Sequence, residues 1–326
     1  MSAFVQQQNS INEFATSDSW VILSPIELSI KKKIESVGTP LKDWDINIYR
    51  GVLTGCNEAF IISSEKRNEI LANCSSEEER QRTDDLIRPI LRGRDIKRYG
   101  YDWANLYLIA TFPSRRYDIE NYPAVKKYLL SYAEENLREA GYGWIADNFL
   151  ADFCKQKLAQ TGKFVELDGN RITIGNTPEK ARKKTRNKWF ETQDSISYWE
   201  DFSKQQIVWI ELSDEPKFAL AEKIMSVNTV FFMTGGHILH LLGLLNSRLI
   251  TWYFKHCIGT TSGVGTNRWL KYTIEQIPMA SVSQRLEELS LHISRSYDQE
   301  MNREIDLTVC QLYNLNDEEI SYLFSQ

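Results

Sequence analysis

Apolar residues recur at intervals of three and four positions in several segments, which is the spacing of a helix with one buried face. Ser24, Pro25 and the segment IELSIKKKIESV predict a capped helix that ends at Gly38 and Pro40. We also predict helices for segments 63–87, 122–141 and 237–257. After residue 280, apolar residues keep this spacing and predict a helical tail; they are Leu286, Leu289, Ile293, Ile305, Val309 and Leu312. Asn316 and Glu319 form the pattern of a capping box for a last helix.

Shorter apolar runs, bounded by turn residues, predict strands. The segment 46–62 is interpreted as two strands around a tight turn at Thr54-Gly55-Cys56-Asn57. Segments 106–112, 206–212 and 228–234 are further predicted strands. The fold class is therefore a mixed α/β (α+β) fold with mixed sheets and loops, followed by a helical C-terminal segment. We divide the chain into an N-terminal arm and helix (1–40), a main body (41–280) and the C-terminal helical segment (281–326), and expect residues 1–19 to be a mobile or partner-docked arm.

Composition agrees with an ordinary folded protein and excludes extensive disorder, since 42% of the 326 residues are hydrophobic and 25% are charged. Five scattered cysteines, none at metal-ligand spacing, favour free thiols in a reducing cytoplasm. The N-terminus does not have the pattern of a signal peptide, and no apolar stretch is long enough for a membrane span, so we expect a cytoplasmic location and no membrane partner.

The formal net charge is −5, yet two short segments are strongly basic. LIRPILRGRDIKRY (86–99) has five cations and one anion, and EKARKKTRNK (179–188) has six cations and one anion. Arginine forks can bridge phosphate oxygens or bind guanine edges, so each segment could be a surface for a polyanion. For 86–99 a solvated charged face is an equal alternative, whereas a run such as 179–188, taken alone, is more often a solvated loop.

The common catalytic patterns are missing from the sequence. It contains no G-x-S-x-G, no P-loop lysine and no H-E-x-x-H. His237 and His240 lack a cysteine or carboxylate at zinc-ligand spacing, so we expect a hydrogen-bonded pair beside a core helix. Asp214, Glu215 and Lys217 are interpreted as an exposed turn rather than a nuclease site. The sequence therefore predicts no metal site and no enzyme activity for this chain alone.

The order of several phrases carries more information than any one of them. The phrases TG-N-AF, LRGRDI-RY, LLNSRL and GVGTNRWLKYTIEQIPMA follow one another between about Trp20 and the C-terminus. In this order they resemble the C-terminal half of TaqI-like and Eco57I-like DNA adenine-N6 methyltransferases, including fused type IIG restriction–modification enzymes. The resemblance implies that residues 41–280 are a target recognition domain, which clamps duplex DNA against a separate methyltransferase domain. That domain would bind S-adenosylmethionine and flip the target adenine.

The resemblance also implies roles for particular residues. Thr54, Gly55, Asn57, Gly93 and Asp95 match the family's turns and are expected to shape its loops. The candidate DNA-binding residues are Arg92, Arg94, Lys97, Arg98, Arg182, Lys183, Lys184, Arg186, Lys188 and Arg268. The family's N-P-P-[YF] and F-x-G-x-G motifs are absent from these 326 residues, so no cofactor is expected in this chain. The alternative is a protein-interaction subunit that docks a separate methylase and has little DNA affinity of its own.

Overall fold

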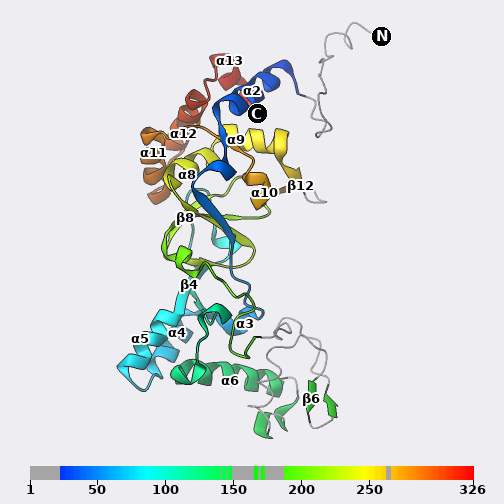
Figure 1. Ribbon diagram of the computed structural model, residues 1–326, viewed down its shortest axis with the longest axis vertical. Helices are drawn as coiled ribbons and strands as arrows, with labels where there is room; N and C mark the ends of the chain where they lie inside the picture. The colour runs from blue at the N-terminus through cyan, green and yellow to red at the C-terminus, as the bar shows by residue number, and fades with distance from the viewer. Residues whose placement is uncertain are drawn as a thin grey trace.

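The computed structural model describes residues 23–139, 141–144, 146–148, 165–167, 170–172, 187–261 and 266–326. These residues form an elongated molecule, with one group of helices at each end and strands between them (Figure 1). Two hydrophobic cores lie along its length. We call the part around the first core the C-helix body, because it contains α2 and helices α8 to α13. The part around the second core contains α3 to α6 and is called the α6 body.

A four-stranded antiparallel sheet joins the two bodies, because its two faces belong to different cores. Trp209 and Phe231 are partners on neighbouring strands and stack in the first core, with ring centroids 5.7 Å apart. Val208 and Phe232, the next pair in the register, lie in the second core. This follows from the two-residue period of a strand, which sends successive side chains to opposite faces. The strands, in sheet order, are β2 (Ile46–Arg50), β11 (Val230–Gly235), β8 (Gln205–Ile210) and β9 (Ala219–Glu222).

The C-helix body closes one face of this sheet with helices that were largely predicted from the sequence. Ser24 and Glu27 form a capping box at the start of α2, and Asn316 and Glu319 form another at α13, so both predicted caps are confirmed. A short antiparallel strand pair joins the segment after α2 to the segment before α11. Its strands are β1 (Thr39–Pro40) and β14 (Pro278–Met279). The helices are α2 (Pro25–Val37), α8 (Ile238–Asn246), α9 (Arg248–Tyr253), α10 (Lys271–Ile274), α11 (Gln284–Arg295), α12 (Gln299–Leu312) and α13 (Asp317–Ser325).

The single helix predicted for 237–257 is wrong. Ser247 adopts an extended conformation (ψ 152°) that ends α8, and its hydroxyl accepts the Ile250 N–H to cap α9. A π-helical turn follows at Phe254–Ile258. The break has a tertiary cause, because the buried Asn246 side chain bonds both backbone groups of Phe218 at 3.2 and 2.8 Å.

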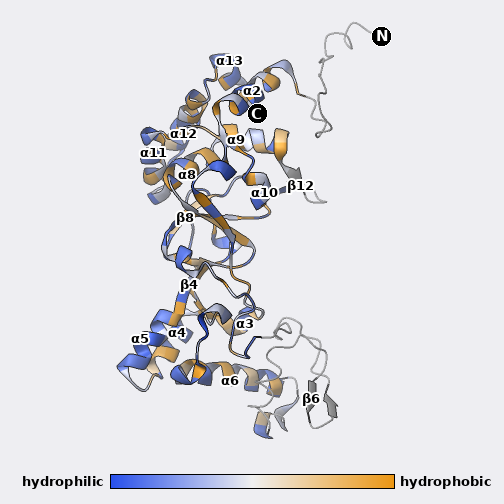
Figure 2. Ribbon diagram, in the orientation of Figure 1, coloured by the Kyte–Doolittle hydropathy of each residue, from blue (hydrophilic) through white to orange (hydrophobic). Residues whose placement is uncertain are grey.

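The α6 body is built from shorter elements. Its sheet has the order β10-β4-β5-β3, with β10 parallel to β4 and the other pairs antiparallel. The two strands predicted in 46–62 are present as β2 and β3, but they do not pair with each other, since the first pairs with β11 and the second with β5. The segment 63–87, predicted to be helical, forms two helices, and α5 is largely hydrophilic (Figure 2). The elements are α3 (Asn57–Phe60), β3 (Ile61–Ser63), α4 (Ser64–Ala72), α5 (Glu77–Leu86), β4 (Ile87–Leu91), β5 (Leu106–Ile109), α6 (Pro123–Glu139) and β10 (Met225–Ser226).

Two small strand pairs complete the described structure. β6 (Val165–Leu167) pairs with β7 (Asn170–Ile172), and β12 (Thr260–Thr261) pairs with β13 (Asn267–Arg268). The observed architecture agrees with the predicted mixed α/β class and its helical C-terminal stretch. The arm proposed for residues 1–19 lies outside the described residues. Within the described part of the chain, no helix combines the length and apolar character needed to cross a membrane.

Candidate nucleic-acid interface

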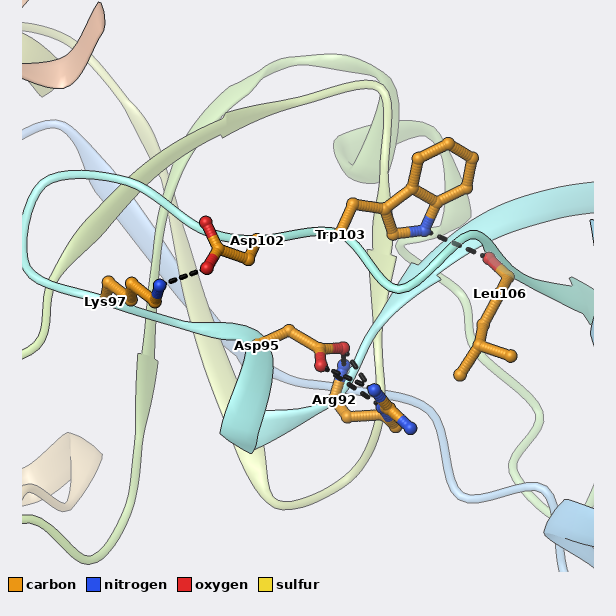
Figure 3. A network of polar contacts seen from close by, with 6 residues as sticks. All are labelled: Arg92, Asp95, Lys97, Asp102, Trp103 and Leu106. Atoms are coloured by element: carbon orange, nitrogen blue, oxygen red, sulfur yellow. Dashed lines mark hydrogen bonds and ion pairs between the residues drawn. The ribbon is translucent and has the colours of Figure 1, made fainter. Parts of the chain in front are cut away.

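The segment 86–99 forms a strand followed by a tight turn that Asp95 holds together. β4 ends at Leu91, and Gly93–Asp95 form one turn of 3-10 helix. The Asp95 carboxylate accepts the Arg92 N–H at 2.9 Å and the Arg92 guanidinium at 2.7 Å (Figure 3). Burial alone would raise the pKa of Asp95, but the hydrogen bonds and charge of Arg92 outweigh it and lower this pKa. Asp95 is therefore an ionised structural residue of the turn.

Gly93 lets this turn lie directly against the end of the central sheet. A Cβ at this position would lie 3.0 Å from Ile210 Cγ2 and 3.6 Å from Thr229 Oγ1. A larger residue would therefore push the turn away from β8. The roles predicted for Gly93 and Asp95 as turn residues agree with this geometry.

The four cations of this segment that are candidate DNA-binding residues differ in how they are bound. Arg92 forms the ion pair with Asp95, and Lys97 pairs with Asp102 on the returning loop (Figure 3). A guanidinium nitrogen of Arg98 donates to the Asn246 carbonyl at the end of α8, and the group lies over the Tyr99 ring. Arg94 is exposed, and its guanidinium has no hydrogen bond or ion pair with any residue in the described part of the chain. The DNA-binding role of all four stays a prediction. Of the four, Arg94 is the one whose side chain forms no hydrogen bond or ion pair with the described residues.

Arg268 lies on a ribbon attached to the same end of β8. Residue 268 pairs with Thr260 on one side and forms a bridge with Leu212 on the other. Its guanidinium contacts the Glu211 carboxylate at 2.7 Å. Trp269 anchors the ribbon, since its indole donates to the Ser213 carbonyl at 2.9 Å and stacks on Phe254 with centroids 3.7 Å apart. The Arg94 turn and the Arg268 ribbon are therefore both fixed to residues 210–212.

The turn at Thr54-Gly55-Cys56-Asn57 is also structural. The buried Thr54 hydroxyl donates to Asn57 Oδ1 at 2.7 Å and accepts the Cys56 N–H at 3.1 Å. Gly55 has a φ of 81°, which glycine adopts without steric cost. The Gln193 N–H bonds the Thr54 carbonyl at 3.0 Å, so this turn holds the segment that follows the second basic cluster.

Most of that second cluster cannot be placed. Arg182, Lys183, Lys184 and Arg186 lie outside the described residues. Lys188 is exposed, and its ammonium lies 5.6 Å from the centroid of the Phe190 ring. Its backbone N–H donates to the Glu191 carboxylate at 2.8 Å. The proposed phosphate contacts of this cluster stay predictions.

Arg50 is a neighbour of the Arg94 turn that the sequence patterns did not single out. Its Nε donates to the Asn228 carbonyl at 2.7 Å, and a Cβ at Gly93 would lie 3.6 Å from Oγ1 of Thr229, the next residue. The side chain of Arg50 is exposed at the end of β2. A single arginine at a strand end carries no signal in the sequence, and only the pairing of β2 with β11 brings it close to residue 93.

The histidines behave as the sequence indicated. His240 is buried, with Nε2 3.1 Å from the Ala280 carbonyl oxygen and Nδ1 accepting the Ser283 N–H. Burial lowers its pKa. His237 contacts the Glu287 carboxylate at 3.0 Å. Among the described residues no group of three or more His, Cys, Asp or Glu side chains is arranged to hold a metal ion.

Residues 88–279 match the sequence model of the TaqI-like C-terminal specificity domain, which covers more than half of the chain. The chain belongs to this family. The match includes the Arg94 turn, Glu211 and Arg268, whereas the turn at 54–57 precedes it. Among curated proteins, no relative matches the chain.

Two solved structures are similar to this specificity domain. One is the type IIG restriction endonuclease BpuSI, with a TM-score of 0.51, 12% identity, and coverage of 92% of this chain and 31% of that one. The other is the type IIL restriction–modification enzyme MmeI in complex with DNA, with a TM-score of 0.48, 13% identity, and coverage of 88% and 36%. At such identities the likeness to BpuSI concerns the fold. The chain thus spans about a third of the length of each of these two proteins.

Proposed function

We propose that this specificity domain recognises a short sequence in duplex DNA for a restriction–modification adenine methyltransferase. The observation that carries the proposal is the pair of cationic elements fixed to residues 210–212 inside the family match. Arg94 presents a guanidinium without an acidic partner among the described residues, and Arg268 presents one that a carboxylate orients. Guanidinium groups neutralise backbone phosphates and form two hydrogen bonds with guanine, so they suit both positioning and base recognition.

Methyl transfer would belong to another part of the system. These residues contain no N-P-P-[YF] tetrapeptide, which in the resembling methyltransferases belongs to the catalytic domain. A separate methyltransferase domain would hold S-adenosylmethionine and receive the flipped adenine. This chain would position the duplex and contribute sequence preference. We place the complete system in the cytoplasm, where its DNA substrate is.

Charge distribution favours a second candidate, a subunit that docks a methylase and binds DNA only weakly. The C-terminal segment 281–326 contains nine Asp and Glu residues and three Arg residues, and this body would repel a duplex that approached it. The two candidates differ in what the isolated chain does with DNA. Sequence-dependent duplex binding supports the first, and tight methylase binding without it supports the second.

The test is selection from a randomised duplex library with the purified chain at two salt concentrations. We expect one short motif to be enriched. R94A should weaken binding to all duplexes and lower the slope of log K against log salt by about one unit. R295A, which changes an exposed arginine on α11, is the matched control and should leave both unchanged. An unenriched library with no salt-dependent binding would exclude the recognition role.

A further inference from the structure

The α6 body carries two neighbouring arginines that none of the sequence patterns identified. Arg115 and Arg116 are exposed at the end of the turn Pro113–Arg115. Neither side chain forms an ion pair with a carboxylate in the described part of the chain. Three other arginines of this body, Arg67, Arg80 and Arg138, each contact an acidic side chain. Two adjacent cations without an acidic partner therefore need a separate explanation.

The structure holds this pair of arginines in a defined place. The Arg115 guanidinium lies 4.0 Å from the centroid of the Trp199 ring, which fixes it by a cation–π contact. The Ser114 hydroxyl donates to the Ile196 carbonyl at 2.8 Å and so ties the turn to the segment that carries Trp199. The guanidinium is thus positioned without being neutralised.

Both loops at this contact have unfavourable backbone conformations. Ile196 has a φ of 42° and Arg116 a φ of 52°, and neither residue type commonly adopts the left-handed region. For a buried β-branched residue such as Ile196 the conformation is a genuine outlier. Strain of this kind persists only where surrounding contacts impose it, and it is concentrated at functional sites. The strained residues here are the ones that place Arg116 at the surface and the Trp199 segment beside the turn.

A continuous set of contacts connects this turn to the candidate interface. Trp199 follows Tyr198, whose hydroxyl donates to the Arg50 carbonyl at 2.9 Å. The Arg50 guanidinium bonds the Asn228 carbonyl, and a Cβ at Gly93, beside Arg94, would lie 3.6 Å from Oγ1 of the adjacent Thr229. These neighbouring segments carry four exposed arginines, Arg94, Arg50, Arg115 and Arg116, which together we call the arginine track. It runs from the central sheet onto the α6 body.

We propose that the Arg115–Arg116 turn is a second contact for the sugar–phosphate backbone of duplex DNA, separate from the Arg94 turn and connected to it by the arginine track. This inference rests on the proposed DNA recognition. The duplex would cross the junction of the two bodies, with phosphates bound on the α6 body. Because phosphates are the same at every step, this contact would strengthen binding to all sequences and leave base preference unchanged.

The experiment measures duplex binding by the full chain against salt, for one selected and one unselected sequence. R115Q/R116Q should raise Kd roughly tenfold for both duplexes and lower the salt slope by about two units. The selected motif should stay the same. R115K/R116K keeps both charges and should restore the slope to near the wild-type value, which separates charge from folding.

R295Q/R303Q is the matched control, because it removes two exposed arginines from helices α11 and α12 of the other body. It should leave the Kd and the slope unchanged. If R115Q/R116Q binds like the wild type while R94A is impaired, the second contact is refuted and the recognition role stands. A wild-type chain that binds neither duplex would refute both. Loss of binding in the lysine variant as well would show that the turn acts through folding and would also refute the phosphate contact.

Discussion

The two bodies are stabilised in different ways. The C-helix body closes its core with helices whose apolar stripes and caps are visible in the sequence, such as α2 with its Ser24–Glu27 box. The α6 body has buried polar groups that bond to residues far away in the chain and hold the ends of its elements, as Asn246 does for Phe218 in the C-helix body. Glu79, 2% exposed, accepts the Ala124 N–H at 2.9 Å and thereby caps α6 from another helix. A body of short elements needs such bonds, because its turns leave many backbone groups without partners in secondary structure.

This difference bears on where the candidate interface lies. The arginine track follows turns of the α6 body and the end of the central sheet, where polar residues already hold the backbone in non-repetitive conformations. Loops on a fixed scaffold are the usual place for binding residues. In the other body, α12 and α13 have more acidic than basic residues, and none of its helices contributes a residue to the track.

The largest expected effect tests whether the central sheet makes the two bodies one cooperative unit. Trp209→Ala removes a buried ring from the first core, and Phe232→Ala removes one from the second. Each should lower the free energy of unfolding by about 3–5 kcal/mol. Hydrogen exchange should show loss of protection in both α6 and α8 for either variant. Loss confined to one body would show that the cores unfold separately.

A smaller effect is expected from pH, with opposite signs for Glu79 of the α6 body and Asp306 of the C-helix body. Burial would raise the pKa of Glu79, but its hydrogen bonds from Ser75 and Ala124 outweigh this and lower it from 4.5. The ionised Glu79 therefore makes its full contribution to the free energy of unfolding above about pH 4.5. This contribution is lost as the pH falls through the pKa of Glu79 in the folded protein. In the C-helix body, burial raises the pKa of Asp306 despite the Arg248 N–H and the nearby arginines. The buried charge of Asp306 therefore lowers the free energy of unfolding at neutral pH, and protonation removes this cost as the pH falls.

Urea midpoints between about pH 7 and pH 3.5 measure this difference. E79Q should lower the free energy of unfolding by about 1–3 kcal/mol at neutral pH. Its stability should then change less with pH than that of the wild type. D306N should lose stability more steeply than the wild type on mild acidification, because the gain from protonating Asp306 is gone. Parallel profiles for the two variants would contradict the assigned signs.

The smallest effect concerns an exposed ion pair. The side chains of Lys97 and Asp102 are 62% and 72% exposed. Solvent screens such pairs, so Lys97→Met should change stability by less than about 1 kcal/mol in thermal unfolding. A cost comparable to that of E79Q would mean that polar contacts in this region matter whether or not they are buried.

Much of the C-helix body could be predicted from the sequence. Helix spacing, Pro25 after Ser24, and the Asn316–Glu319 box are local features, and the residues that specify them are neighbours in the chain. The strands around 106–112, 206–212 and 228–234 were visible for the same reason. The order of the family phrases also indicated the specificity domain, which the match over 88–279 confirms.

Only the tertiary structure decided which strands pair and which basic side chains stay exposed. Strand propensity cannot show that β2 pairs with β11 rather than β3, because hydrogen-bond partners far apart in sequence leave no local pattern. The break at Ser247 likewise depends on Asn246 bonding Phe218, 28 residues away. In the segment 86–99 five cations look equivalent, yet Asp95, Asp102 and Asn246 engage three of them. The sequence determined that the segment is basic, and only the fold leaves Arg94 exposed and without an ion pair in the described part of the chain.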